Sequence, residues 1–335
     1  MMRERTGKVV VITGASAGVG RATALCFAGH GARIGLIARR SDALEATKGE
    51  VEAAGGQGIV CSADVADAAA IEAAAAAVER EFGPIDIWIN NAMTTVFAPF
   101  DEITPEEFRR VTEVTYLGFV YGTMAALRRM KARDQGVIVQ VGSALAYRSI
   151  PLQSAYCGAK HAIVGFTDSI RSELIHDRSH VRITAVHLPA MNTPQFEWCR
   201  TKLPRQPQPV PPILQPEVAA EAIYRASDGS RREVSVGFST VKAIQGQKVA
   251  SGYADRYLAR NGYDGQQTSE PVAADRPDNL FEPVERMHRT HGRFDRQASA
   301  WSAQMWLNTH RSAAVLIGGA MLAAAAGAFR RATSR

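Results

Sequence analysis

The sequence predicts an α/β fold in which a doubly wound parallel sheet of about seven strands is covered by helices on both faces. Short apolar runs rich in β-branched residues alternate with helix-length segments between residues 8 and 190. Each run is apolar nearly throughout, which is typical of parallel strands that are covered on both faces. A glycine-rich turn directly follows the first run. Strand–helix alternation of this kind implies right-handed crossovers between the strands.

We expect six strands in this part of the chain and a seventh, later strand that closes one edge of the sheet. The expected strands are Lys8–Thr13, Arg33–Ala38, Gly58–Ala63, Asp86–Asn90, Val137–Gly142, Arg182–Leu188 and Glu233–Gly237. The expected helices between them are Val19–Gly29, Asp42–Ala54, Asp67–Phe82, Pro105–Arg133 and Ser154–His176.

A proline-rich segment follows the sixth strand. Pro194–Pro216 contains seven prolines, so it cannot form a regular helix or a central strand. Its position puts it over the carboxyl edge of the sheet, where ligands bind in open α/β sheets. Phe196 and Trp198 stand at its start. We interpret the segment as a substrate lid, and the alternative is a plain surface connection.

The chain is expected to divide into three regions. Residues 1–262 carry the α/β pattern. Residues 263–311 are polar and show no clear period, which predicts a linker with a short helix near Ala298–Asn308. Residues 312–329 are free of charged side chains and predict an apolar helix.

This apolar segment, residues 312–329, is at the lower limit of length for crossing a bilayer. Its small residues Gly318, Gly319 and Ala323 would allow close contact between helices in a membrane. We expect it to anchor the chain as a C-terminal tail, which would leave a cytoplasmic catalytic body. The alternative is a soluble helix packed on a neighbouring element or subunit.

The distribution of charge argues against nucleic acid as a partner. The formal net charge is +6, and the eight arginines and two acidic residues of segment 285–335 account for all of it. A neutral body with a basic end is the wrong pattern for a nucleic-acid-binding face. It suits a tail that meets an anionic surface.

Cysteine and histidine spacing excludes two further classes of protein. Cys26, Cys61, Cys157 and Cys199 are far apart and form no C-x-x-C pair, so a zinc ribbon and a disulfide scaffold are both disfavoured. The eight histidines contain no H-E-x-x-H motif, and we expect no metal site.

The glycine-rich turn has the spacing of a phosphate-binding loop. Gly14 allows a tight turn out of the strand, Gly18 lets the backbone approach a pyrophosphate, and Gly20 lets the helix pack close to the sheet. The new helix presents free N–H groups and its positive dipole end to the phosphates. The expected dinucleotide contacts from this turn are Thr13, Gly14, Ser16, Gly18, Val19 and Gly20.

The end of the second strand favours NADP(H) over NAD(H). A carboxylate at this point would bind the adenosine ribose hydroxyls, whereas Arg39 and Arg40 offer forked cations for a 2′-phosphate. The alternative is that both arginines are solvated charges at a helix start. Further cofactor contacts are expected after the third and fourth strands, at Asp64, Val65, Asn91 and Ala92.

A serine at the end of the fifth strand, with a tyrosine and a lysine on the helix that follows, predicts proton-transfer chemistry. Ser143 ends that strand, and Tyr156 and Lys160 lie four residues apart on one face of the following helix. A neighbouring ammonium lowers the pKa of a phenol. Tyr156 would then act as general acid in reduction and general base in oxidation, while Ser143 orients the substrate oxygen.

The expected substrate pocket is mainly apolar, which favours an apolar alcohol, ketone or aldehyde. Its expected wall comprises Met93, Ala144, Leu145, Tyr147, Leu152, Met191, Phe196 and Trp198.

These motifs together resemble the short-chain dehydrogenase/reductase family over about residues 6–255. The matching elements are the T-G-x-x-x-G-x-G turn, Asn90-Asn91-Ala92, Ser143, Tyr156-x-x-x-Lys160 and Pro189-x-x-x-Thr193. The resemblance implies a Rossmann-type catalytic domain that interconverts alcohols and carbonyls with NAD or NADP. It also implies that Lys160 binds the nicotinamide ribose, that Pro189 and Thr193 lie at the nicotinamide carboxamide, and that the long helices form a homodimer or homotetramer.

The chain departs from the family pattern at two positions. Met93 follows Asn-Asn-Ala where many members have Gly, and Thr115 stands where many carry a catalytic Asn. That Asn helps to hold a water on the path from the lysine to solvent, and Thr has a shorter reach. A nucleotide-binding regulatory or scaffolding protein with impaired chemistry is therefore the alternative function. Sugar-nucleotide epimerisation is a third, although such relatives usually have a longer substrate domain.

Overall fold

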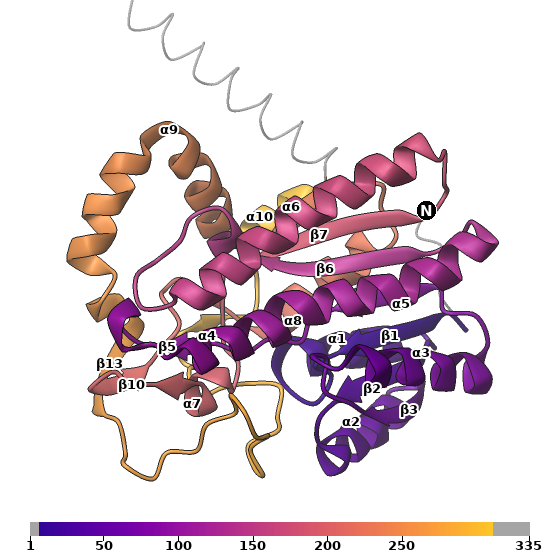
Figure 1. Ribbon diagram of the computed structural model, residues 1–335, viewed down its shortest axis with the longest axis horizontal. Helices are drawn as coiled ribbons and strands as arrows, with labels where there is room; N and C mark the ends of the chain where they lie inside the picture. Colours follow the sequence, from indigo (N-terminus) through magenta and orange to yellow (C-terminus); the bar gives the residue numbers. More distant parts are fainter. Residues whose placement is uncertain (1–6, 311–335) are drawn as a thin grey trace, which may run out of the picture.

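Seven parallel strands form the central sheet in the order β12-β7-β6-β4-β1-β2-β3, which confirms the predicted fold class (Figure 1). The structure is a computed structural model, and it describes residues 7–310. The strands are β1 Val9–Thr13, β2 Arg33–Ala38, β3 Gln57–Ser62, β4 Ile87–Asn90, β6 Val137–Ser143, β7 Arg182–Leu188 and β12 Glu233–Ser235. The last of these closes one edge, as expected.

The parallel register brings the carboxyl ends of the strands together. Thr13 at the end of β1 pairs with Ile37, and Ser143 at the end of β6 pairs with Leu188 of β7. Every loop that leaves these strands therefore starts at one edge of the sheet, where α/β folds bind their ligands.

Helices cover both faces of the sheet. They are α1 Gly18–Ala28, α2 Ser41–Ala53, α3 Ala68–Phe82, α4 Pro105–Thr112, α5 Gly118–Arg133, α6 Ser154–His176 and α8 Pro216–Ala226. The core on one face joins α1, α2 and α8 to the sheet, and the core on the other joins α3, α5 and α6 (Figure 1). The two cores fix the sheet edge that carries the site.

The helix predicted over Pro105–Arg133 is interrupted. A π-helical turn, η2 Glu113–Leu117, separates α4 from α5. Such turns are rare and occur mostly at functional sites. The apolar spacing of the segment fits one long helix, so the interruption was not expected.

The proline-rich segment forms short pieces of structure at the carboxyl edge. It begins with the one-turn helix α7 Gln195–Trp198. Its short strands and their partners are β5 Val96–Phe97, β8 Ala190–Met191, β9 Arg200–Thr201, β10 Arg205–Pro207, β11 Ile213–Leu214, β13 Gln267–Pro271 and β14 Ala298–Ser299. They join the proline-rich segment to parts of the chain far away in sequence.

The segment predicted as a polar linker instead contributes to the packing of the body. Leu280, Val284 and Phe294 are buried, and Leu280 and Phe294 belong to apolar clusters beside the cavity described below. These apolar residues stand singly among polar ones, so the sequence shows no helical or strand period. Within the segment, the helix expected near Ala298–Asn308 is α10 Ala303–Thr309. The boundary at residue 262 stays a prediction.

The helix before this segment, α9 Gly237–Asn261, is bent at Ala250. Among the described residues no helix is long and apolar enough to cross a membrane. The apolar segment 312–329, expected as a membrane anchor, lies outside the described residues.

Candidate active site

A cavity of about 480 Å³ lies at the carboxyl edge of the sheet. Its walls come from the loops after β1, β2, β3, β4, β6 and β7. The proline-rich segment, the ends of α9 and residues between 279 and 288 close it from outside. The volume is within the usual range of ligand pockets.

The glycine turn at one end of the cavity has the geometry of a phosphate-binding loop. Gly14 and Gly18 have φ of +68° and +54°, a backbone region that favours glycine. A side chain at Gly20 would collide with the carbonyl oxygen of Gly14 and lie 2.6 Å from Asn91 Nδ2. Ala17 provides no side-chain cap for α1, so the helix N-terminus can bind phosphate groups.

Two of the residues predicted in this loop act indirectly. Thr13 and Gly20 do not line the cavity, whereas Gly14, Ser16, Gly18 and Val19 do. Thr13 Oγ1 instead accepts hydrogen bonds from the backbone N–H groups of Asn91 at 2.9 Å and Ala92 at 3.1 Å. Asn91 Nδ2 donates to the Thr13 carbonyl at 2.9 Å. These bonds hold the end of β4 against the loop.

Arg39 and Arg40 line the cavity, but each has a protein partner. Arg39 donates to the carbonyl oxygens of Phe281 at 2.8 Å and Asn279 at 2.6 Å. Burial lowers the pKa of Arg39. Arg40 Nε donates to Asp42 at 2.8 Å. Asp64, which also lines the cavity, forms an ion pair with Arg110.

Residues 279–292, which we call the strap, cross this end of the cavity. The Arg289 carbonyl accepts from the backbone N–H of Gly18 at 3.0 Å, and the His288 carbonyl accepts from Arg21 at 2.6 Å. The Arg289 guanidinium binds both carboxylate oxygens of Glu197, at 2.6 and 2.7 Å. Sequence reasoning missed the strap because most of these contacts use backbone carbonyls, which leave no trace in residue type.

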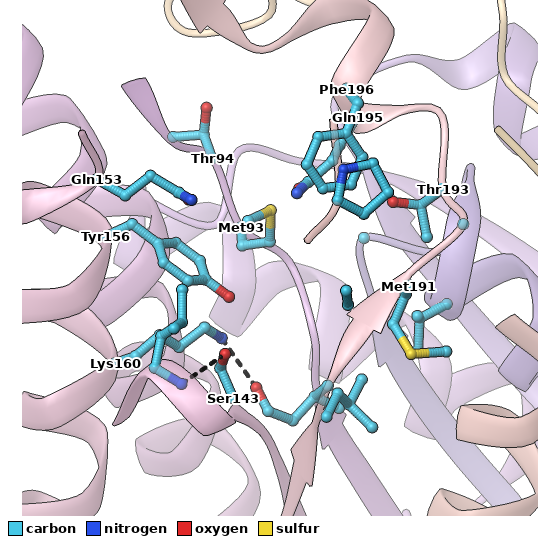
Figure 2. Close-up of a pocket in the computed structure, with 18 of the residues that line it drawn as sticks. Met93, Thr94, Ser143, Gln153, Tyr156, Lys160, Met191, Thr193, Gln195 and Phe196 are labelled. Atoms are coloured by element: carbon cyan, nitrogen blue, oxygen red, sulfur yellow. Dashed lines mark hydrogen bonds between the residues drawn. The ribbon is translucent and has the colours of Figure 1, made fainter. Parts of the chain in front are cut away.

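Ser143, Tyr156 and Lys160 come together at the other end of the cavity (Figure 2). In Figure 2 the Tyr156 hydroxyl points into the cavity, and the side chains of Ser143 and Lys160 lie beside it. Ser143 Oγ accepts a hydrogen bond from the backbone N–H of Leu145 at 3.1 Å. Lys160 Nζ donates to the Val141 carbonyl at 2.9 Å.

The expectation that Lys160 lowers the pKa of Tyr156 is wrong for this arrangement. Burial raises the pKa of Tyr156 above its ordinary value, and the nearby Ser143 hydroxyl offsets only part of that shift. Burial also lowers the pKa of Lys160 to about 7.

Thr115 does not line the cavity. Its Oγ1 donates to the Thr94 carbonyl at 2.8 Å and accepts from the Thr94 backbone N–H at 3.0 Å. The single proton of the Thr115 hydroxyl is therefore used in the bond to Thr94. This side chain cannot also donate a hydrogen bond to a water on a path from Lys160.

Most residues of the predicted substrate wall line the cavity, with two exceptions. Met93, Ala144, Leu145, Met191, Phe196 and Trp198 line the cavity, as do the predicted cofactor contacts Val65, Ala92, Pro189 and Thr193. Tyr147 and Leu152 do not. Tyr147 points away and donates to Glu233 at 2.7 Å, and Leu152 is buried beside Phe97 and Phe196. Both errors arose because nearness in sequence says little about direction in a loop.

Several polar side chains in the wall were not predicted. Thr94, Gln153 and Gln195 project into the same region as Met93 and Phe196 (Figure 2). Gln153 Nε2 donates to Gln266 Oε1 at 2.8 Å, which ties the start of α6 to the segment after α9. No glutamine motif in the sequence indicates this contact.

Comparisons with known proteins place these features in a family. The sequence pattern described as short chain dehydrogenase matches residues 8–203. The chain is 31% identical over 272 residues to the uncharacterized oxidoreductase YxnA of Bacillus subtilis, covering 81% of this chain and 76% of that protein. It is 33% identical over 261 residues to the levodione reductase of Leifsonia aquatica, and the match covers 73% of this chain and 96% of that protein. A crystal structure of levodione reductase superposes with a TM-score of 0.54 at 35% sequence identity. The superposition covers 57% of this chain and 75% of that one.

Proposed function

Because the chain belongs to the short-chain dehydrogenase family, we propose that it is an oxidoreductase that moves a hydride between NADP(H) and an apolar alcohol or carbonyl compound. One observation carries the proposal. Tyr156, whose hydroxyl points into the cavity, and Ser143 line the same cavity as the glycine turn at the start of α1.

The residues around the cavity fit a dinucleotide. Gly14, Gly18 and the start of α1, which has no side-chain cap, would hold its phosphates, and Val65 and Ala92 offer apolar contacts beyond them. Pro189 and Thr193 would lie at its nicotinamide end. When bound, the cofactor supplies or accepts the hydride.

The protein's own contribution to the chemistry is proton transfer. In reduction, Tyr156 would donate its hydroxyl proton to the substrate oxygen as negative charge develops there, and Ser143 would hold that oxygen by a hydrogen bond. In oxidation, Tyr156 would take the proton back. Lys160 is buried beside Tyr156, with Nζ 5.6 Å from the centre of its ring, and would replace the proton that Tyr156 gives up.

The preference for NADP(H) rests on Arg39. Its guanidinium lines the cavity beside the end of β2 and can form a forked pair with a 2′-phosphate. The two strap carbonyls that now accept from Arg39 hold it at this end of the cavity. Asp64 is paired with Arg110, so its charge is partly neutralised.

The substrate class rests on the apolar part of the wall. Met93, Met191 and Phe196 lie around the space next to Tyr156, and Leu145 also lines the cavity. Apart from Lys160, which the proposed chemistry uses, the polar side chains labelled there are neutral. An apolar ketone, aldehyde or alcohol would bury its surface against this wall.

The alternative function is a nucleotide-binding regulatory or scaffolding protein with impaired chemistry. The engagement of the Thr115 hydroxyl with Thr94 is the observation that favours it. We also propose that the long helices α5 and α6 form a homodimer or homotetramer interface. The membrane anchor at residues 312–329 stays a prediction.

The test is turnover of a panel of apolar ketones and alcohols with NADPH, NADP, NADH and NAD. Wild-type protein and Tyr156→Phe would be compared. We expect turnover with the phosphorylated cofactors and a loss of at least roughly 100-fold in Tyr156→Phe. Tight cofactor binding without turnover of any compound would favour the regulatory alternative.

A further inference from the structure

A second, small cavity lies on the other side of Lys160 from the main cavity. It measures about 10 Å³, close to the room that one water molecule needs. It is enclosed between α6 and the β6–β7–β12 side of the sheet. Lys160, Thr167, His187 and Glu233 contribute to its wall.

Some buried polar atoms of the residues that line this small cavity lack a hydrogen-bond partner. Thr167 Oγ1 is buried and unpaired, and so are Nδ1 and Nε2 of His187. His187 is 1% exposed. Buried polar atoms are nearly always paired with protein or with ordered water. An unpaired hydroxyl and an unpaired ring nitrogen at one cavity of this size therefore indicate a bound water molecule.

The inner end of the cavity is Lys160. Its hydrogen bond to the Val141 carbonyl uses one N–H of the ammonium group, which carries three. The remaining N–H groups have a water within the small cavity as a suitable acceptor. Lys160 also lines the main cavity, so this side chain connects the two spaces.

The outer end of the cavity is Glu233. His187 Nε2 lies 3.4 Å from Glu233 Oε2, too poorly aligned for a good hydrogen bond. The side chain of Glu233 is 28% exposed. The neighbouring His187 ring and the Tyr147 hydroxyl hold the pKa of Glu233 at about 2, so this carboxylate is charged and reaches solvent.

We propose that His187 and Glu233 relay protons between Lys160 and solvent through one water held in this small cavity. The proposal rests on the proposed function, because a relay is needed only if Tyr156 exchanges protons with a substrate. The Thr115 hydroxyl, whose proton is engaged with Thr94, leaves that role open. The charged and titratable groups around His187 are Lys160, Asp168 and Arg171 from α6, Glu233 from β12, and Tyr147.

In each reduction the protein gives one proton to the substrate and takes one proton from solvent. In reduction Tyr156 loses its hydroxyl proton to the substrate oxygen, and the Lys160 ammonium replaces it and becomes a neutral amine. The amine takes a proton from the cavity water while that water takes one from protonated His187. Neutral His187 then takes a proton from solvent water beside the ionised Glu233 carboxylate, which stabilises the imidazolium that forms. Oxidation reverses each transfer.

The kinetic test separates the first turnover from later ones. In His187→Gln the first hydride transfer should stay within twofold of wild type, because Tyr156 already carries its proton. Steady-state kcat should fall by about tenfold, less than the roughly 100-fold or more that loss of a direct acid or base costs, and should recover as imidazole buffer is added. Glu233→Gln, on the sheet edge, should give a smaller fall of the same kind.

The control is Thr47→Val, which removes a buried helical hydroxyl far from the cavity and should leave kcat unchanged. Thr167→Val removes the matched hydroxyl at the cavity and should lower kcat. A folded His187→Gln or Glu233→Gln protein with unchanged kcat and no buffer dependence would overturn the relay while leaving the oxidoreductase assignment standing.

A second test needs no substrate. Histidine NMR titration of the cofactor-free protein would follow His187 in wild type, in Lys160→Met and in Lys131→Met as the distant control. Removing the ammonium across the cavity should raise the pKa of His187, because a like charge disappears. An equal pKa in all three proteins would contradict the shared cavity, even if the protein turned over no compound in the panel.

Discussion

The carbonyl oxygen of Arg289 accepts a 3.0 Å hydrogen bond from the backbone N–H of Gly18, the first residue of α1. This N–H belongs to the helix end that would bind the cofactor phosphates. A strap from late in the chain thus touches the phosphate-binding loop, and the same strap holds Arg39 through two further carbonyls. Entry and exit of a dinucleotide should therefore depend on how firmly the strap is held.

The ion pair between Glu197 and Arg289 joins the strap to α7 by side chains at both ends. Glu197→Gln should speed both association and dissociation of NADPH by several-fold, since loosening the strap lowers the barrier in both directions. Stopped-flow fluorescence of NADPH would measure the two rates. Glu270→Gln, which removes the partner of Arg293 outside the cavity, is the matched control and should change neither rate.

Arg39 should set the cofactor preference. Arg39→Ala should raise the Kd of NADPH by about tenfold, from the loss of a charge-assisted forked pair, and should change the Kd of NADH far less. Because Arg39 also holds the strap, the ratio of the two Kd values is the informative quantity. An unchanged ratio, measured by fluorescence titration, would count against the 2′-phosphate role.

Gly20 should be indispensable for packing. A methyl group there meets the Gly14 carbonyl and Asn91, so Gly20→Ala should lower the free energy of unfolding by roughly 1–3 kcal/mol. Gly165→Ala in the middle of α6 is the control, because nothing lies within 4 Å of a side chain there. That change should raise stability by about 0.5–1 kcal/mol. Urea unfolding of both variants would show whether the signs are opposite.

The stability of the protein should rise with pH above neutrality because of Lys160. Its pKa is about 7 in the folded protein, against 10.5 for a free lysine, so the unfolded chain binds more protons in this range. This group should contribute an increase of about 1 kcal/mol per pH unit between pH 7 and 10. Lys160→Met should lose that increase, and Lys48→Met on the surface should keep it, as chemical unfolding at several pH values would reveal.

The fold and the cofactor end of the site follow from the sequence more readily than the rest. Buried strands such as Arg33–Ala38 and Arg182–Leu188 carry their own apolar pattern, and their bounds agree with β2 and β7. Gly14, Gly18 and Gly20 are needed for local backbone reasons, so their spacing is informative by itself. Each of these features depends on residues close together in the chain.

The features that sequence reasoning missed depend on distant contacts. The strap contacts the cavity mainly through backbone carbonyls. Thr115, in the π turn, accepts a hydrogen bond from the backbone of Thr94. His187 lies near Glu233 only because β7 and β12 pair. The direction of Tyr147, away from the main cavity, depends on the same pairing. Residue type at one position does not encode such partners.

Thr115 offers the last and sharpest test of how protons reach Lys160. Thr115→Val would leave the buried N–H and C=O of Thr94 without partners and should cost about 1–3 kcal/mol of stability, whereas Thr115→Ser should retain both bonds. Thr115→Asn places the amide of many family members at this position. If protons travel through His187, this change should alter kcat by less than twofold. A large increase in kcat would instead mean that the wild-type route is limited at Thr115, and combining Thr115→Asn with His187→Gln would then restore the rate that His187→Gln alone had lost.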